Sequence, residues 1–485
     1  MARDNRRVID RIEVEAGDEL LVAHAGLLAF VQWCVRKGIL RLIAKRLPAA
    51  GSTGYPPEDM VLTLWVAMLL RGSRTVLETV DTLRRNAGLM ALLGMKEMPS
   101  STTMADWLRR LGEVELRGEE RSGCADGLRK VQDLFYESAA QVLRELRGVV
   151  DRTLDFDAMC IAESKQYAEW MYTGERGTMS YLGFVGSVCV MAELEPGNHS
   201  PNDHIAERVR SCMDVCAKAG MPVRKLRSDA AGYTAGLFDL CEEKGRQVKY
   251  FVRARQDDAV QASERAIPSH EWTPWQVRMA HEKLRDAVLA DTAHAMAKAK
   301  EGFRLVVERR QEEEADTEEQ DGLLVRVPRV VTTHQAIATN DHSLSCADVL
   351  AFYNRRQGND EQGNDKLKND VMLGALPCRG AYGLPANCAY GYLAAMLHNV
   401  FEWYKHDCLG KEQMPLRLPT IVQRDFAVAA RVTLHARTVT LTLASYARDA
   451  AAALQNSIDR IRRKVKRMAI PPVAPSFSPM IFRRA

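Results

Sequence analysis

The acids that follow strand-like segments are the residues in this sequence best suited to chemistry. Asp157 lies in the run Leu154–Ile161, and Asp229 follows the run Val223–Leu226. Carboxylates that reach one small volume from separate rigid elements can hold two metal ions for phosphodiester chemistry. We therefore interpret both acids as metal ligands. Asp155 shares the strand face of Asp157, so either could be the ligand, and a surface acid on an edge strand is the alternative.

Asp229 precedes a small-residue turn and a predicted helix beginning near Tyr233. Ligand sites in α/β sheets gather at such carboxyl ends of strands. Asp before a helix is also a common N-cap, which is the alternative interpretation of this residue.

A third acidic segment runs from Tyr353 to Lys368 and contains Glu361. Glu361 and Lys368 are seven residues apart, two helical turns, and so share a helix face. An acid flanked by cations could hold a metal while Lys368 contacts the adjacent phosphate. A salt-bridged surface helix is the alternative.

The elements that must position these acids change character along the chain. From Glu19 to about Leu146 the apolar spacing is helical throughout, and near Val149 strand-like runs begin and then alternate with helices. This order predicts a mixed sheet in an α/β core. Residues 256–344 interrupt the rhythm, and we interpret them as an insertion with a long charged helix over Trp275–Lys300, an acidic turn, and strands Phe303–Glu308 and Leu323–Val331.

Further helices are expected over His204–Ala219, Tyr233–Lys244, from Ser345 through Tyr353 and on to Val371 after an interruption at Gly358, Ala386–Tyr404 and Ala444–Met468, with strands at Val432–Leu434 and Val439–Leu441.

The segment from Ser73 to Leu111 has the pattern of a helix-turn-helix motif, with helices expected over Ser73–Arg84, Leu89–Leu93 and Met104–Leu111. A turn and N-cap precede a helix that would show Thr103, Arg109 and Arg110 to solvent while its apolar residues pack inward. A helix that reads a DNA groove has this arrangement, and so does an ordinary surface helix of a bundle.

The pair Trp272 and Trp275 could stack on an unpaired base, although core packing is the plainer interpretation.

Bulk properties exclude several classes of protein. The longest apolar stretches are far shorter than the roughly 20 residues of a membrane span, and Met1 to Val14 lacks the features of a signal peptide, so we expect a cytoplasmic location. Eleven scattered cysteines without a C-x-x-C pair predict reduced thiols. A formal charge of +4 is only mildly basic. After Asp459, however, the chain carries basic residues and no acids, which suits either phosphate contact or a solvated tail.

Taken together, the three acidic segments resemble the DDE transposases of bacterial insertion sequences, in particular the class with a Tyr-x2-Arg-x3-Glu-x6-Lys signature. The resemblance covers most of residues 50–405, including the Gly174–Gly177 turn and Leu367–Arg379. It implies that Asp157, Asp229 and Glu361 bind the catalytic Mg²⁺, or Mn²⁺, and that Tyr353, Arg356 and Lys368 contact DNA.

The implied fold is an α/β RNase H-like catalytic core with an inserted subdomain, preceded by an all-helical DNA-binding region. On this interpretation residues 1–147 are the DNA-binding region, 148–255 and 345–410 the two parts of the core, 256–344 the insertion, and 411–485 a basic C-terminal region.

Two departures from the family pattern concern the metal ligands. Four residues rather than three separate Arg356 from Glu361, which leaves Asp360 as an alternative ligand, although the Glu361–Lys368 interval is preserved. Met159 stands where the family commonly has Thr, so a local hydroxyl is lost.

The function implied is cleavage and strand transfer of double-stranded DNA at terminal inverted repeats and target DNA, by a homodimer acting on nucleoid DNA. Two alternatives are a nuclease of the same fold without strand transfer and a decayed copy that only binds DNA.

Overall fold

The computed structural model describes residues 17–49, 54–72, 74–112, 126–278, 284–320, 323–355, 363–380, 383–435 and 438–472; for 277–278, 284–285, 312–320, 323–330 and 446 it describes the backbone alone. Among these residues, no helix is both long and apolar enough to cross a membrane. The ten cysteines in this part are free thiols, as predicted.

Helices make up nearly all of the described N-terminal region. They are α1 (Leu27–Lys37), α2 (Ile39–Arg46), α3 (Pro57–Leu70), α4 (Val76–Leu83), α5 (Ala87–Leu93), α6 (Ser101–Gly112) and α7 (Asp126–Leu146). The prediction of an all-helical region was wrong at one point, because Leu20–Val22 forms strand β1 and pairs with Ala430–Val432 of β12. Local spacing could not reveal a strand whose partner lies near the other end of the chain.

Two long helices form the centre of the helical body. Helix α3 is buried on nearly all sides, and Trp65 donates its indole N–H to Leu393 O at 2.9 Å on helix α13 (Gly383–Cys408). Helix α13 is buried over most of its length and packs against α6, α7 and the sheet strand β5. A helix that is apolar all round belongs in a core, so α13 joins the helical body to the sheet.

A ten-stranded mixed sheet carries the predicted acids. Its order is β3-β4-β2-β6-β7-β11-β10-β9-β8, with β5 paired to β4. The strands are β2 (Thr153–Ala162), β3 (Glu169–Trp170), β4 (Arg176–Val185), β5 (Val188–Pro196), β6 (Lys225–Ser228), β7 (Lys249–Arg253), β8 (Thr273–Arg278), β9 (Leu284–His294), β10 (Phe303–Gln320) and β11 (Leu323–Thr339). Strands β2, β6 and β7 run parallel, and the other pairs are antiparallel. The mixed α/β architecture is therefore confirmed.

The helices predicted in and after the first part of the core are present. They are α8 (Ile205–Lys218), α9 (Ala235–Glu242) and α11 (Cys346–Asn354), with α10 (Asp258–Arg265) in addition. After Gly363 the chain continues into a short π-helix, Lys366–Asp370.

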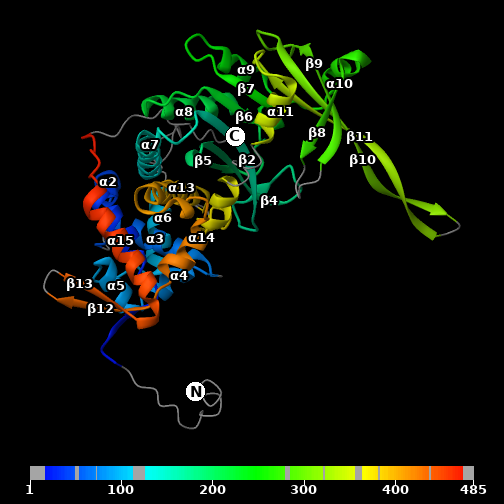
Figure 1. Cartoon of the computed structure of the whole chain (residues 1–485). Coiled ribbons are helices and arrows are strands. Elements are labelled where there is room, and N and C mark those ends of the chain that lie inside the picture. Colours follow the sequence, from blue (N-terminus) through cyan, green and yellow to red (C-terminus); the bar gives the residue numbers. More distant parts are fainter. Residues whose placement is uncertain are drawn as a thin grey trace.

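The insertion differs most from its prediction. The helix predicted over Trp275–Lys300 was wrong, because strands β8 and β9 occupy most of this range and pair with each other and with β10. Alanine, lysine and glutamate favour a helix locally, but pairing along a sheet edge overrides that preference. The predicted acidic turn is also wrong, since Glu312–Glu319 lies within β10. Beyond the pairing with β9, strands β10 and β11 continue as a two-stranded arm that projects from the molecule (Figure 1).

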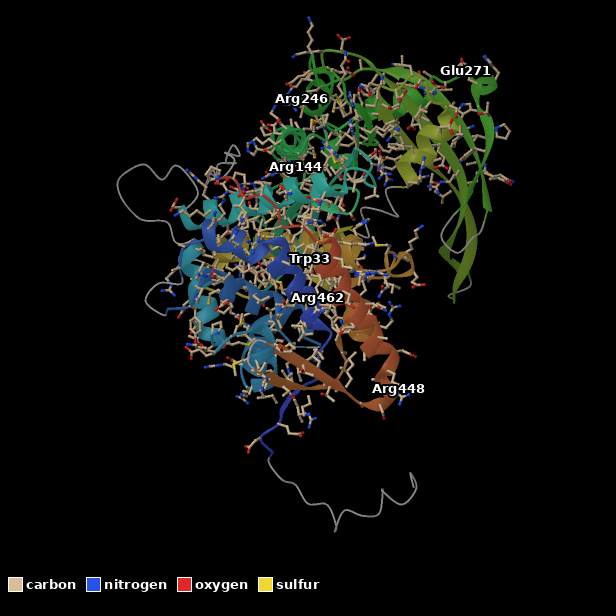
Figure 2. All side chains as sticks on the ribbon, turned by 60° about the vertical axis from the view of Figure 1, so that its left-hand side comes forward. Trp33, Arg144, Arg246, Glu271, Arg448 and Arg462 are labelled. Atoms are coloured by element: carbon tan, nitrogen blue, oxygen red, sulfur yellow. The ribbon has the colours of Figure 1, made fainter. Side chains whose placement is uncertain are left out.

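The C-terminal region folds back onto the N-terminal helices. Its elements are α14 (Leu418–Ile421), β12 (Ala430–His435), β13 (Thr438–Leu443) and α15 (Arg448–Lys464), and their presence confirms both predicted strands and the final predicted helix. Strands β1, β12 and β13 form a small sheet, and α15 packs on α1. Figure 2 shows Arg448 of α15 at the opposite end of the molecule from Glu271 of the insertion.

Candidate active site

Asp157 on β2 and Asp229, the residue directly after β6, are brought side by side by the pairing of these parallel strands. The register pairs Phe156 of β2 with Ser228, the last residue of β6, so the next residue of each segment is an acid. Both carboxylates are partly exposed, whereas the strand residues before them are buried. Parallel pairing thus delivers two acids from separate rigid elements to one end of the sheet.

The structure distinguishes Asp155 from Asp157. Asp155 is buried and accepts two hydrogen bonds from Arg227, at 2.5 and 2.6 Å, and Arg227 also donates to Phe352 O at 3.0 Å. A buried bidentate pair of this kind neutralises the carboxylate and occupies both of its oxygens. Both oxygens of Asp155 are therefore engaged by Arg227, which favours Asp157 as the candidate metal ligand.

A sequence signal for this pair exists. Arg227 stands two residues before Asp229, just as Asp155 stands two residues before Asp157. Parallel strands in register bring the two pairs opposite each other, which sequence reasoning missed because it did not align the two strands.

Asp229 also performs the capping role considered from sequence. Its Oδ1 accepts a hydrogen bond from the Ala231 N–H at 3.0 Å, at the start of a 3-10 turn. A carboxylate has about four lone-pair sites, so capping and metal binding are compatible in one side chain.

Asn364 is a site residue that sequence reasoning missed. Its Nδ2 donates to Asp157 Oδ2 at 2.7 Å, and its buried Oδ1 has no hydrogen-bond partner among the described residues. Because Asn364 follows Glu361 by three residues, this bond brings the end of the signature segment to Asp157. The available signal was that spacing, since residues three apart on a helix share a face.

The signature residues themselves are only partly described. Arg356, Asp360 and Glu361 lie outside the described residues. Lys368 is exposed on the π-helix Lys366–Asp370.

Tyr353 is buried in a second hydrophobic cluster beneath the insertion, with Phe251, Val306 and Ile337. That is the position of a packing residue, and its contact with phosphate stays a prediction.

The residues at this site suit a hard divalent cation. Asp157 and Asp229 supply carboxylate oxygens, and Asn364, which is bonded to Asp157 through its Nδ2, carries an amide oxygen without a partner among the described residues. Mg²⁺ and Mn²⁺ prefer such oxygen ligands. Within the described part of the chain, no group of three or more His, Cys, Asp or Glu side chains is arranged to hold a metal ion. The third predicted acid, Glu361, falls outside it.

Helix α6 has the exposure pattern predicted for the end of a helix-turn-helix. Arg110 is exposed, and Arg109 pairs with Asp106 at 2.6 Å, while Trp107 and Leu108 are buried. Thr103 is half-buried and shares a hydrogen bond with Ser100 at 2.9 Å, so it belongs to the N-terminal turn of the helix. DNA contact by these residues stays a prediction.

The two tryptophans of the insertion have packing contacts. Arg309 lies 4.2 Å above the ring of Trp272, and Trp275 packs against the second hydrophobic cluster. These contacts favour the packing interpretation over base stacking.

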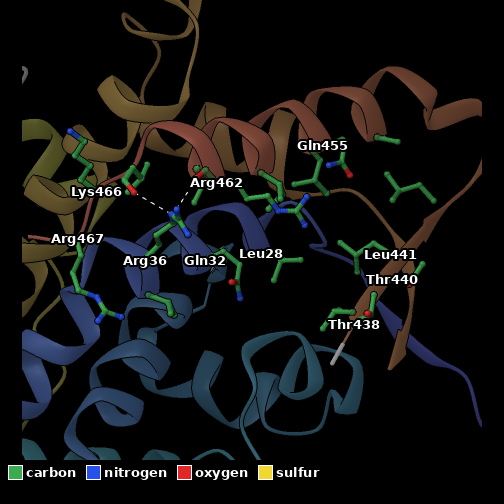
Figure 3. A pocket seen from close by; sticks show the side chains of 18 residues that line it. Leu28, Gln32, Arg36, Thr438, Thr440, Leu441, Gln455, Arg462, Lys466 and Arg467 are labelled. Atoms are coloured by element: carbon green, nitrogen blue, oxygen red, sulfur yellow. Dashed lines mark hydrogen bonds between the residues drawn. The ribbon is translucent and has the colours of Figure 1, made fainter. Parts of the chain in front are cut away.

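A separate groove lies elsewhere in the described structure. A hollow of about 1510 Å³ opens between α1, β13, α15 and the segment that follows α15, and Leu28, Leu441 and Arg462 are among its lining residues (Figure 3). It is separate from Asp157 and Asp229, which lie on the large sheet.

Comparison with known proteins decides the family. The model described as Transposase DDE domain group 1 matches residues 6–466. The chain belongs to this transposase family. A search of the curated proteins found no match for the transposase. Among solved structures it is similar to a cryo-EM structure of the piggyBac transposase synaptic complex with hairpin DNA. The identity is 12%, covering 93% of this chain and 87% of that one, with a TM-score of 0.42.

Proposed function

We propose that this transposase cuts and joins DNA strands at the ends of its own mobile element, with divalent metal held by Asp157, Asp229 and Glu361. The observation that carries the proposal is the register of β2 and β6, which places Asp157 beside Asp229. The bond from Asn364 to Asp157 supports Glu361 as the third ligand, because it brings the adjacent segment to the same place.

Each protein group has a defined part in this chemistry. When bound, Mg²⁺ or Mn²⁺ would polarise the phosphate and activate water or a 3′-hydroxyl. Asp157 and Asp229 supply negative oxygens from fixed strands, and Asn364 orients Asp157 by donating to its Oδ2. The pair of Asp155 with Arg227 holds the two strands together directly beneath the acids.

The partner we propose is double-stranded DNA, both the terminal inverted repeats and the target. Arg109, Arg110 and Lys368 are cations exposed or half-exposed on the described surface, as phosphate contact requires. We further propose that the transposase acts as a homodimer on two DNA ends, in the cytoplasm on the nucleoid, and that its core has the RNase H fold.

The deciding experiment uses a labelled duplex that carries the terminal repeat flanking the gene, with Mg²⁺. Wild type is compared with Asp157→Ala, Asp229→Ala and Glu361→Ala, and Asp258→Ala, an exposed acid of α10, serves as the control. We expect cleaved and joined products from wild type and the control, and none from the other three variants. Asp360→Ala tests the alternative ligand, and it should retain both products.

Two results would contradict the proposal. Cleavage without joining, when a 3′-hydroxyl is supplied, would indicate a nuclease of the same fold. Repeat-specific binding by the wild type without any cutting would indicate a decayed copy that only binds DNA.

A further inference from the structure

The short π-helix that follows Asn364 is held at both ends by one arginine. Arg417, the residue before α14, donates from Nε to Asp370 Oδ2 at 3.2 Å and from Nη2 to Asp370 Oδ1 at 2.5 Å. Its Nη1 pairs with Asp365. Asp365 precedes the π-helix Lys366–Asp370, and Asp370 is its last residue. A single guanidinium therefore bridges the two ends of this π-helix.

The contact with Asp370 is the stronger of the two. The Asp370 side chain is 4% exposed, and both of its oxygens accept from Arg417 in the bidentate geometry that suits a guanidinium and a carboxylate. Asp365 is 41% exposed, so water screens its pair with Arg417. The π-helix is thus anchored at its C-terminal end, and the same cation orients Asp365 at the other end.

The backbone of this segment is an unusual one that depends on support from its neighbours. A single π-turn is rare and occurs frequently at functional sites. Met372, two residues beyond it, has a φ of 68°, in the left-handed region that few residues other than glycine adopt. Arg71, at the end of α3, donates to Asn369 O at 2.9 Å. Tyr390 of α13 donates its hydroxyl to Met372 O at 3.1 Å. Together with Arg417, these side chains hold the segment in this shape from three separate elements.

Two residues of the segment belong to the candidate active site. Asn364, directly before Asp365, donates to Asp157 Oδ2 at 2.7 Å. Lys368 lies in the middle of the π-helix, and its stem packs on Gly374, where an added Cβ would come within 2.6 Å of the lysine Cγ. A shift of the π-helix would therefore displace both the amide that bonds Asp157 and the amine predicted to contact phosphate.

We propose that Arg417 is a positioning residue of the metal site, because by holding the π-helix it keeps Asn364 in place against Asp157. The inference rests on the proposed function, which makes Asp157 a metal ligand. Residues that orient metal ligands change metal affinity even though they do not bind the metal themselves. Arg417 acts through Asn364, so the two residues affect metal binding as one unit and their losses do not add.

The test measures the binding of Mn²⁺ alone to the full, metal-free chain, by electron paramagnetic resonance of the unbound ion, so that no cleavage is involved. The variants are Arg417→Ala, Arg417→Lys, Asn364→Ala and the combination of Arg417→Ala with Asn364→Ala. Arg424→Ala is the matched control, because Arg424 is a 48% exposed arginine that follows α14 and pairs with Asp425 at 3.0 Å.

A further variant keeps the test valid if Arg417→Ala folds poorly. Loss of Arg417 alone leaves Asp370 buried without its cation, which destabilises the fold. Arg417→Ala combined with Asp370→Asn breaks the clamp and leaves no unpaired buried charge. Urea unfolding of every variant verifies that the chains compared are folded.

Arg417→Ala should raise the Kd for Mn²⁺ about tenfold, and the combination with Asp370→Asn should match it. Arg417→Lys keeps the charge without the two-pronged geometry, so its loss should be smaller. Arg424→Ala should bind Mn²⁺ as wild type does. In the Asn364→Ala background, Arg417→Ala should cause no further loss, because the amide through which it acts is already absent.

Hydrogen exchange supplies a local measurement in the same samples. The amides of Leu373 and Gly374 donate to Leu367 O at 2.8 Å and to Lys368 O at 3.0 Å. They should exchange faster in Arg417→Ala and at the wild-type rate in Arg424→Ala, because exchange reports local opening.

Two results would overturn the inference. One is an unchanged Kd in Arg417→Ala with a lower urea midpoint, since a pair that only stabilises the fold leaves the metal affinity of folded molecules as it was. The other is a pair of losses that multiply when Arg417→Ala and Asn364→Ala are combined.

Failure here is distinguishable from failure of the proposed function. A wild-type chain that binds no Mn²⁺, or binds it equally well after Asp157→Ala, would contradict the proposed function. A Mn²⁺ site that depends on Asp157 and is unaffected by the loss of Arg417 would contradict the positioning role alone.

Discussion

The amide of Asn364 is the described link between the signature segment and Asp157. It donates one hydrogen bond to Asp157 and presents a buried oxygen with no partner in the described structure. Residues that orient metal ligands commonly change metal affinity or activity by 10 to 100-fold when they are removed. Asn364 is thus a positioning residue whose loss should weaken the site without destroying it.

Asn364→Ala should lower the cleavage rate about 10 to 100-fold and raise the Mg²⁺ concentration needed for half-maximal rate. A Mg²⁺ titration of cleavage measures both quantities. Asn369→Ala is the matched control, because Asn369 is an exposed amide on the same segment. A uniform loss of rate with an unchanged Mg²⁺ requirement would argue against a role in holding the metal ligand.

The buried pair of Asp155 and Arg227 makes a prediction about stability. Asp155→Asn leaves the guanidinium of Arg227 buried without its counter-charge, which should cost about 3–5 kcal/mol of unfolding free energy. Urea unfolding measures this cost. Glu19→Gln breaks the exposed pair with Arg431 and should cost no more than about 1 kcal/mol. Equal urea midpoints for Asp155→Asn and wild type would show that the pair does not stabilise the folded state.

The site residues that could be predicted from the sequence are those recognisable within a single segment. Asp157 and Asp229 are recognisable because each acid stands in or after an apolar strand. The choice between Asp155 and Asp157 depends on Arg227, which lies on a strand 72 residues away, so it could be predicted only by aligning the two strands. Asn364 was missed for the same reason, since its partner lies 207 residues away.

At the scale of elements, helix α8 is joined to strand β5 by a buried arginine of α8, which lies between two glutamates of β5. Arg208 lies 3.5 Å from Glu193 and 3.0 Å from Glu195, and all three side chains are largely buried. Burial raises the pKa of Glu195 from 4.5 to about 7, although Arg208 acts in the opposite direction. One guanidinium does not fully compensate two carboxylates removed from water.

This arrangement predicts a pH dependence of stability. Between pH 4.5 and about 7 the folded state holds the Glu195 proton more tightly than the unfolded state, so rising pH removes stability over that window. Glu195→Gln keeps a hydrogen-bond acceptor but cannot ionise. Its stability relative to wild type should therefore improve from pH 4.5 to pH 8, by on the order of 3 kcal/mol.

Urea unfolding of both proteins at several pH values measures the difference. Glu169→Gln, an exposed acid on β3, should track wild type throughout. A difference between Glu195→Gln and wild type that stays constant across the pH range would refute the assignment.

The insertion shows where element prediction reached its limit. Helices α8, α9 and α13 were predicted because their apolar side chains recur at helical spacing, and the structure buries these side chains. Strands β8 and β9 were missed because their stability comes from pairing with β10 and not from their own composition. The same cause hid β1, which depends on β12.

At the scale of the whole molecule, helix α1 near the start of the described chain is hydrogen-bonded to the segment Arg462–Met468 near its end. Arg36 on α1 donates to Arg462 O at 2.7 Å and to Val465 O at 3.1 Å, as Figure 3 shows. Met468 N–H donates to Lys37 O at 2.9 Å. The described part of the C-terminal region, up to residue 472, therefore packs onto the N-terminal helices.

Arg36→Ala removes both side-chain bonds and should lower the unfolding free energy by about 1–3 kcal/mol. Arg462→Ala is the matched control, because the bond uses the backbone carbonyl of Arg462 while its side chain is 69% exposed. Thermal unfolding compares the two. A control that melts as early as Arg36→Ala would mean that the α1–α15 contact depends on Arg462 as well and not on Arg36 alone.

The pairing of β1 with β12 also sets an order of events during synthesis. More than four hundred residues separate the two strands, so at 5–20 residues per second β1 leaves the ribosome tens of seconds before its partner. During that time the apolar surface of α1 that later meets α15 has nothing to cover it. A truncated messenger RNA, or a ribosome that stops early, would therefore release a chain in which this apolar surface of α1 is exposed. Such a chain would be prone to aggregation or proteolysis. The helical body of the transposase is therefore complete only after β12 and α15 have been translated.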